Sequence, residues 1–198
     1  MYAEIDKTML ARLATLSAAG AYGAAYRILD VAVAPLLSLL IASYTRFFKD
    51  GAEGVSGSIR VARRLFPLAA GYSALAGVGL FVIAPYIPLL LGPDYTNAVG
   101  TIRWLAVLPF IRSIQFLGAD TLTGAGHQGL RSSLCIVVAI FNVAINLWLI
   151  PAYSWLGAAW ATLASDGLFA VLVWGSVFWL HHGETVRGRA VLQPAPGG

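Results

Sequence analysis

Long apolar runs separated by short polar turns set the hydropathy pattern of this chain. The clearest run, residues 130–150, carries a single charge, Arg131, at its front edge. As a helix it is long enough to cross a hydrocarbon core of roughly 30 Å. Pro151 is expected to end this helix because proline lacks the N–H donor, and Gly157 soon opens another apolar run. Two hydrophobic helices joined so tightly should be antiparallel neighbours, so the pattern predicts a polytopic membrane protein.

The same alternation along the chain predicts an all-α fold, a six-transmembrane-helix bundle over residues 1–180. The predicted spans are residues 1–19, 24–44, 65–91, 98–122, 130–150 and 157–180. The first span is amphipathic and short for a full crossing of the membrane. Residues 18–23, which are rich in alanine and glycine, are interpreted as a turn or a close-packed helix end.

Two polar segments complete the predicted organisation. Residues 45–64 connect the second and third spans, and their second half is predicted to be an amphipathic helix that lies on the membrane surface. Residues 181–198 form a polar tail that contains proline and glycine. This tail is predicted to be disordered and cytoplasmic, because it has too little apolar surface to bury.

Composition and charge favour a membrane protein over a soluble one. The chain of 198 residues is 59% hydrophobic and 11% charged, whereas soluble domains carry about a quarter charged residues. A net charge of +4 is compatible with nucleic acid, but the basic residues lie between the apolar runs instead of on one soluble face. No nucleic-acid partner is therefore expected. Cys135 is the single cysteine, which excludes an intrachain disulfide and a cysteine-built metal site.

The basic residues also predict an orientation in the membrane. With six spans, the second and fourth connections and the C-terminal tail share one side. The basic residues of these segments are Arg46, Lys49, Arg60, Arg63, Arg64, Arg131, Arg187 and Arg189. The opposite connections carry almost none, so the positive-inside rule places the basic side and both termini in the cytoplasm.

Charged residues inside the predicted spans are the candidates for function, because a charge at the bilayer centre costs at least ~2.5–3.5 kcal/mol. Arg112 lies in the middle of the fourth span, so it should face a wet cavity or a carboxylate partner. Nearer the ends of that span, Arg103 can extend towards the outer membrane surface and Asp120 towards the inner turn. Arg27 and Asp30 are three residues apart on one helical face, where they can form a local ion pair.

Other polar residues in the spans have more than one interpretation. Asp6, Lys7 and Arg12 lie on the first helix, where Asp6 and Lys7 are either in the membrane or close to a helix end in water. Asn142 and Asn146 fall on one face of the fifth span, where an interhelical hydrogen bond worth on the order of 1 kcal/mol is the favoured explanation. Asp166, in the sixth span, is either a carboxylate that takes up protons or the counter-ion of an arginine.

No arrangement of residues indicates an enzyme. The chain has no phosphate-binding GxxxxGKS loop, no metal-spaced set of histidines and cysteines and no serine elbow. His127, His181 and His182 fall in a turn and in the tail, where solvated histidines are usual. We therefore expect no catalytic residues, no cofactor and no metal site, and this chain alone is not expected to be an ATP-driven pump.

Short motifs that follow one another along the chain resemble a known transporter family. Residues 6–10 (DKTML) and 20–28 (GAYGAAYRI) resemble the D-x-x-M-L … G-x-Y-x-A-A-x-R opening of the second half of Wzx-type polysaccharide flippases, in the MATE-like MOP superfamily. Further matches, in the same order as in the family, are Leu90-Leu91-Gly92 with Tyr95 and Ala98, Leu122 with Gly124-Ala125-Gly126, Asn142 and Asn146, Leu149-Ile150-Pro151, and Gly157-Ala158-Ala159 with Ala161-Thr162. The resemblance covers residues 1 to about 175, which correspond to one half of such a transporter.

This resemblance implies a flippase that exports lipid-linked oligosaccharides, the repeat units of polysaccharides, across the bacterial inner membrane by alternating access. Such proteins have two six-helix halves around a central cavity. The partners implied are a missing N-terminal half or a second copy of the chain, membrane lipids, and a polyprenyl-diphosphate sugar.

The positions of the charged residues suggest two roles in such a transporter, headgroup binding and ion coupling. The candidates for binding the diphosphate headgroup are Arg112, Arg27, Arg12 and Arg103. The candidates for coupling transport to protons or sodium are Asp6, Asp30, Asp120 and Asp166.

Two alternatives stay open. A MATE-type multidrug or cation antiporter belongs to the same superfamily, but acids and aromatic residues should dominate its cavity. Here the intramembrane arginines are at least as numerous as the acids. The alternative from a different class is a non-transporting membrane scaffold or a gene remnant, and a complete N-terminal half encoded directly upstream would argue against a remnant.

Overall fold

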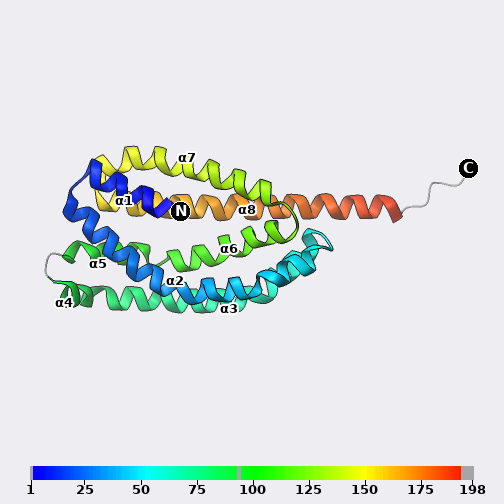
Figure 1. Ribbon diagram of the computed structural model, residues 1–198, viewed down its shortest axis with the longest axis horizontal. Coiled ribbons are helices and arrows are strands. Elements are labelled where there is room, and N and C mark those ends of the chain that lie inside the picture. Colours follow the sequence, from blue (N-terminus) through cyan, green and yellow to red (C-terminus); the bar gives the residue numbers. More distant parts are fainter. Residues whose placement is uncertain (1, 93–94, 193–198) are drawn as a thin grey trace, which may run out of the picture.

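The structure, a computed structural model, describes residues 2–92 and 95–192, and this part of the chain is helical and contains no strand (Figure 1). Its elements are α1 (Tyr2–Leu13), α2 (Leu16–Gly51), α3 (Val55–Ile83), the short 3₁₀ helix η1 (Ala84–Tyr86), α4 (Ile87–Leu91), α5 (Thr96–Leu105), α6 (Leu108–Gly124), α7 (Gln128–Tyr153) and α8 (Trp155–Leu192). The long helices lie roughly side by side, and α8 extends well beyond its neighbours at one end (Figure 1). The predicted all-α class is confirmed.

Helices long and apolar enough to cross a membrane form most of the bundle. Among the described residues, four meet this criterion: Leu16–Gly51, Val55–Leu89, Gln128–Tyr153 and Trp155–Val186. A fifth span results if α5 and α6, which meet at a bend of 40°, are taken together. The predicted count of six is not confirmed, because α1 is 12 residues long and a full crossing needs about 20.

The start of α2 differs from the prediction. Residues 18–23, interpreted as a turn or a close-packed helix end, lie in the first turns of α2, so no turn forms there and the break falls before them at residues 14–15. The Oγ1 atom of Thr15 accepts a hydrogen bond from the backbone N–H of Ala18 at 3.2 Å and so caps the helix. Ala18 and Tyr22 are buried in the core, and this burial keeps the glycine-rich stretch helical.

The prediction of a separate surface helix between the second and third spans is wrong. Residues 55–64 form the first part of α3, which continues without a break to Ile83. Val55, Val61 and Ala62 are buried, because α3 packs against α2 and α6. The bundle, and not a membrane surface, covers the apolar face of this segment.

Pro151 does not end α7, in contrast to the prediction. The helix continues to Tyr153, and the chain turns at Ser154, which has a left-handed φ of 54°. A proline removes one donor and disturbs one preceding turn, and membrane helices tolerate this where neighbours satisfy the freed carbonyl. The backbone N–H of Ser154 donates to the Ile150 carbonyl at 2.8 Å and closes the last turn.

The predicted disordered tail is also corrected over the residues that the structure describes. Residues 181–192 continue α8 as a helix, and residues 193–198 lie outside the described part. The Glu184 carboxylate accepts a hydrogen bond from the backbone N–H of Val55, with its two oxygens 3.0 and 3.1 Å from the nitrogen. The extension of α8 therefore satisfies an N–H group at the start of α3 that has no partner inside its own helix.

Helices α2 and α6 approach each other closely at one point, where Gly51 faces Gly124. A Cβ atom at Gly51 would overlap the Gly124 carbonyl, and one at Gly124 would overlap the Phe47 carbonyl. Glycine lets the two backbones meet because it has no side chain. This contact sets the separation of α2 and α6 next to the α6–α7 turn.

Replacing Gly124 with alanine is expected to destabilise the protein by about 1–3 kcal/mol, because the added methyl group would push α2 away from α6. The measurement is the Tm of the purified protein in detergent. Gly71→Ala is the matched control, since a Cβ at this exposed position of α3 meets no atom within 4 Å and alanine favours a helix. Equal Tm values for the two variants would contradict the close contact.

Candidate functional site

Asp6 is fully buried although it carries a carboxyl group. It lies on α1, where that helix packs against α7 and α8. Its Oδ1 atom accepts a hydrogen bond from Asn146 Nδ2 at 2.7 Å, and its Oδ2 atom accepts one from Thr162 Oγ1 at 2.8 Å. The sequence left open whether Asp6 lies among the helices or in water, and the structure places it inside the bundle.

Asn142 and Asn146, both fully buried, extend this polar cluster along α7. Asn146 Nδ2 also donates to Asn142 Oδ1, and Asn142 Nδ2 donates to Ser165 Oγ of α8, both at 3.1 Å. Asn146 Oδ1 is buried and has no hydrogen-bond partner among the described residues, which is costly for an amide oxygen. The residues of this Asp6 cluster are Asp6, Asn142, Asn146, Thr162 and Ser165.

Two tyrosines of α2 connect the Asp6 cluster to a second set of charges. The hydroxyl of Tyr22 lies 2.9 Å from Thr162 Oγ1, and its ring packs on that of Tyr26, with centroids 5.1 Å apart. Both tyrosines are fully buried. The Tyr26 hydroxyl accepts a hydrogen bond from Arg112 Nη2 at 3.5 Å, so a line of contacts runs from α1 through α8 and α2 to α6.

Arg112, on α6, lies between two carboxylates from different helices. Its Nε atom donates to Asp166 Oδ2 of α8 at 3.2 Å, and its Nη1 atom is 3.7 Å from Asp30 Oδ1 of α2. The guanidinium also lies over the Tyr26 ring, 5.7 Å from the centroid. The Asp166 side chain is 5% exposed and that of Arg112 15%, whereas that of Asp30 is 59% exposed. This Arg112 network, made of Arg112, Asp30, Asp166 and Tyr26, is therefore open on the side of Asp30.

The Arg112 network decides two points that the sequence left open. Arg112 has carboxylate partners, and Asp166 is the counter-ion of an arginine. The structure does not show the local pair of Arg27 with Asp30. Asp30 instead pairs with Arg112 of another helix, and Arg27 is exposed.

The other candidate arginines lie outside the Arg112 network. Arg103, on α5, is exposed, and its guanidinium carbon lies 5.2 Å from the centroid of the Phe81 ring on α3. Arg12 and Arg27 are exposed on α1 and α2. Of the four arginines proposed for headgroup binding, Arg112 is thus the one that the described structure pairs with a buried carboxylate.

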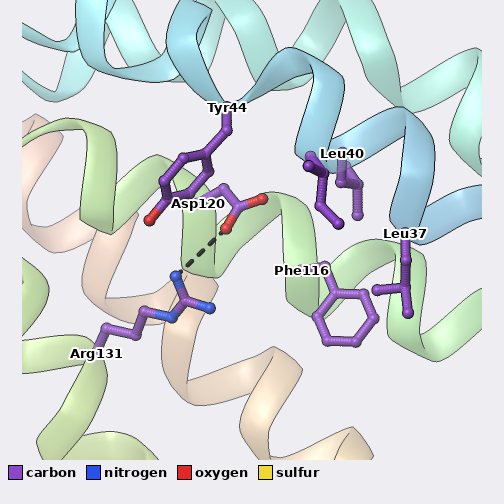
Figure 2. A pocket seen from close by; sticks show the side chains of 7 residues that line it. Leu37, Leu40, Tyr44, Phe116, Asp120 and Arg131 are labelled. Atoms are coloured by element: carbon purple, nitrogen blue, oxygen red, sulfur yellow. Dashed lines mark hydrogen bonds and ion pairs between the residues drawn. The ribbon is translucent and has the colours of Figure 1, made fainter.

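Asp120, the remaining candidate for ion coupling, lies in a separate cleft near the α6–α7 turn (Figure 2). Its Oδ1 atom accepts a hydrogen bond from Nη1 of Arg131 at 3.3 Å, and the same nitrogen donates to Thr123 Oγ1 at 2.8 Å. Asp120 was expected to extend towards the turn that follows the fourth span, and it lies beside that turn. It is 8% exposed and paired with Arg131 in the first turn of α7.

Four members of the site are not among the functional residues predicted from the sequence: Tyr22, Tyr26, Thr162 and Ser165. A weak signal exists for the first three, since Tyr22 and Tyr26 are four residues apart on α2 and Thr162 precedes Asp166 by four residues on α8. Such spacings place side chains on one helical face. They are also common in ordinary helix packing, so spacing does not single these residues out.

Comparison with known proteins supports a membrane location. Over 97 residues the chain is 27% identical to a protein of Methanocaldococcus jannaschii that is named as an uncharacterized membrane protein. The match spans 46% of this chain and 19% of that protein, so it corresponds to about a fifth of the relative's length. No protein-family model matches the chain. No solved structure matches it.

The apolar helices and this relative together show an integral membrane protein with several apolar helices. The name of the relative gives no activity or substrate. The features of the chain that point to a function are therefore the polar groups that the bundle holds among those helices.

Proposed function

We propose that this chain is one half of an alternating-access transporter that moves a lipid-linked oligosaccharide across a membrane, driven by a cation gradient. The observation that carries the proposal is the presence of two connected polar sites, the Asp6 cluster and the Arg112 network, among helices of membrane-spanning length. Charges at such positions are costly, and in membrane proteins they mark substrate and ion pathways.

The Arg112 network suits an anionic headgroup. A guanidinium is a planar fork that can donate two parallel hydrogen bonds to phosphate oxygens. The contact of Arg112 with the exposed Asp30 is long, at 3.7 Å, whereas the contact with the buried Asp166 is 3.2 Å. A diphosphate could replace Asp30 while Asp166 holds the arginine in position. A polyprenyl-diphosphate sugar has this headgroup, and its tail can stay in the lipid.

The Asp6 cluster suits a small, hard cation. It gathers oxygen atoms from a carboxylate, two amides and two hydroxyls, and hard cations prefer such ligands. Asn146 Oδ1, which has no partner among the described residues, is available as a ligand. Binding of Na⁺ would displace the donors that now contact Asp6 and so change how α1 packs on α7 and α8. This link between occupancy and helix packing is what ion coupling requires.

The open side of the Arg112 network needs a covering partner. Arg27 and the Asp30 carboxylate are exposed on α2, a helix of membrane-spanning length, and lipid cannot solvate them. The proposal therefore includes a second helical half, either an N-terminal half or a second copy of this chain, that encloses a wet cavity against α2. On this proposal the protein lies in a bacterial inner membrane with both termini in the cytoplasm, and it is neither an enzyme nor dependent on a cofactor.

Translocation in proteoliposomes tests the proposed function. The protein, assembled with its second half, is reconstituted with a polyprenyl-diphosphate oligosaccharide, and access of a membrane-impermeant glycosidase to the sugar is followed with a Na⁺ gradient, a proton gradient or none. We expect gradient-driven translocation that falls about tenfold or more in Arg112→Lys, because lysine keeps the charge beside Asp166 but loses the bidentate contact.

Arg60→Lys is the matched control, since Arg60 pairs with Glu53 on the surface, where both side chains are mostly exposed. This variant should translocate at the wild-type rate. An unchanged rate in Arg112→Lys would remove Arg112 as the headgroup contact. Absence of translocation under either gradient would contradict the flippase, and gradient-driven export of an organic cation instead would favour the MATE-type alternative.

A further inference from the structure

The cleft that holds Asp120 and Arg131 is amphipathic along its length. It encloses about 250 Å³ between α2, α6 and the start of α7, and its lining residues are Leu37, Leu40, Ile41, Tyr44, Phe116, Asp120 and Arg131. Tyr44, Asp120 and Arg131 lie at one end and Leu37 and Phe116 at the other (Figure 2). The cleft thus has a polar end and an apolar end.

The polar and apolar ends of the cleft are ordered as the headgroup and the acyl chains of a membrane lipid would be. Asp120 lies four residues before the end of α6, about 6 Å along the helix axis at 1.5 Å per residue, and Arg131 is in the first turn of α7. Phe116 is one turn further into α6, and Leu37 lies about two turns from Tyr44 towards the middle of α2. The polar end therefore faces the end of the bundle, and the apolar end faces its interior.

The polar end presents one donor group and one acceptor group side by side. Arg131 Nη1 binds Asp120 Oδ1 and Thr123 Oγ1. Among the described residues, the structure gives no partner to the other guanidinium nitrogens of Arg131 or to Asp120 Oδ2. The Arg131 side chain is 30% exposed and that of Asp120 11%, so these remaining groups can reach a ligand in the cleft.

We propose that this cleft binds a zwitterionic phospholipid with a primary amine, the headgroup class of phosphatidylethanolamine. Arg131 binds the phosphate with its unused N–H donors, and Asp120 Oδ2 accepts a hydrogen bond from the ammonium group. One acyl chain lies along Leu37, Leu40 and Phe116. An anionic lipid fits less well, because it would bring a phosphate to the paired charges without a cation for Asp120. This site is separate from the Asp6 cluster and the Arg112 network and does not depend on the proposed transport.

Lipid-dependent stabilisation of the intact, delipidated protein in detergent tests this inference. Phosphatidylethanolamine is expected to raise the Tm at lower concentrations than phosphatidylglycerol or phosphatidylcholine, because the latter two lack an N–H donor for Asp120. Arg131→Gln should raise the concentration needed about tenfold, equivalent to about 1.4 kcal/mol. Asp120→Asn should abolish the preference for phosphatidylethanolamine over phosphatidylglycerol.

The matched controls are Arg60→Gln and Glu53→Gln, which alter an arginine–carboxylate pair on the exposed surface of the same protein and should keep the wild-type lipid response. Equal stabilisation of the wild type by the three lipids would overturn the proposal. So would a wild-type response in Arg131→Gln, or equal stabilisation by soluble phosphoethanolamine, which has no acyl chain.

A second measurement works on the wild-type protein and so does not depend on the folding of any variant. Phosphatidylethanolamine with a photoactivatable group in one acyl chain is added, the sample is irradiated, and the labelled peptides are identified by mass spectrometry. Label should appear in the α2 peptide with Leu37 and Leu40 and in the α6 peptide with Phe116, and excess unlabelled phosphatidylethanolamine should suppress it. Label confined to other helices would overturn the assignment of the cleft.

Discussion

Replacing Arg112 with alanine is expected to lower the free energy of unfolding by about 3–5 kcal/mol, because it leaves a buried carboxylate without its counter-ion. The stranded group is Asp166, whose side chain is 5% exposed and whose Oδ2 atom lies 3.2 Å from Arg112 Nε. Asp30 contributes less to this loss, since its Oδ1 atom lies 3.7 Å from Arg112 Nη1 and its side chain is 59% exposed, on the side of the proposed wet cavity. Unfolding of the purified protein in detergent, by heat or by denaturant, measures the effect.

The double variant Arg112→Ala/Asp166→Asn should recover a large part of this loss, because it removes the charge that the single variant strands. Arg27→Ala is the matched control, an exposed arginine on α2 whose replacement should change stability by no more than about 0.5 kcal/mol. If Arg112→Ala is as stable as Arg27→Ala, the assignment of Asp166 as a counter-ion is wrong.

Replacing Asp6 with asparagine is expected to weaken Na⁺ binding at least about 100-fold, because it removes the one carboxylate from a cluster whose other side chains are neutral. Asparagine has nearly the same shape, and the amide of Asn146 and the hydroxyl of Thr162 can still hydrogen bond to it. The fold should therefore survive. The measurement is the Tm as a function of Na⁺ concentration, with choline chloride keeping the ionic strength constant, since a ligand that binds only the native state raises its stability.

Asp30→Asn is the matched control, because Asp30 is an exposed carboxylate outside the Asp6 cluster. It should keep the Na⁺-dependent rise in Tm that the wild type shows and that Asp6→Asn loses. A wild-type protein whose Tm does not respond to Na⁺ would contradict sodium binding at the Asp6 cluster. Neither this measurement nor the Arg112 series requires a transport assay, so a failed flippase proposal would leave both results interpretable.

The hydropathy pattern was sufficient to predict the long helices. It was not sufficient to predict several of the residues at which they begin and end. An apolar run of about 20 residues has one stable form in a bilayer, a helix, and α2, α3, α7 and α8 contain the runs from which they were predicted. The ends depend on individual contacts. Thr15 starts α2 through a single side-chain hydrogen bond. Glu184 on the extended α8 binds the N–H of Val55, 129 residues away in sequence, and a local pattern cannot reveal such a partner.

The candidate site, like the helices, could be predicted only in part from the sequence. The sequence alone singles out Asp6, Arg112 and Asp166. Each is a charged residue within a predicted span, and the free-energy cost of placing a charge there depends on the apolar run around it. Their partners could not be predicted in this way, since Asp6 meets Asn146 and Thr162 across 140 and 156 residues of sequence.

These contacts depend on the rotation and axial offset of packed helices, which interlocking side chains on both partners set together. A change of one turn, about 5.4 Å, would separate Arg112 Nε from Asp166 Oδ2, now 3.2 Å apart, without altering any helix. The sequence thus identifies the charged groups that are costly to bury in this membrane protein, and the packing of its helices identifies the groups that stabilise them.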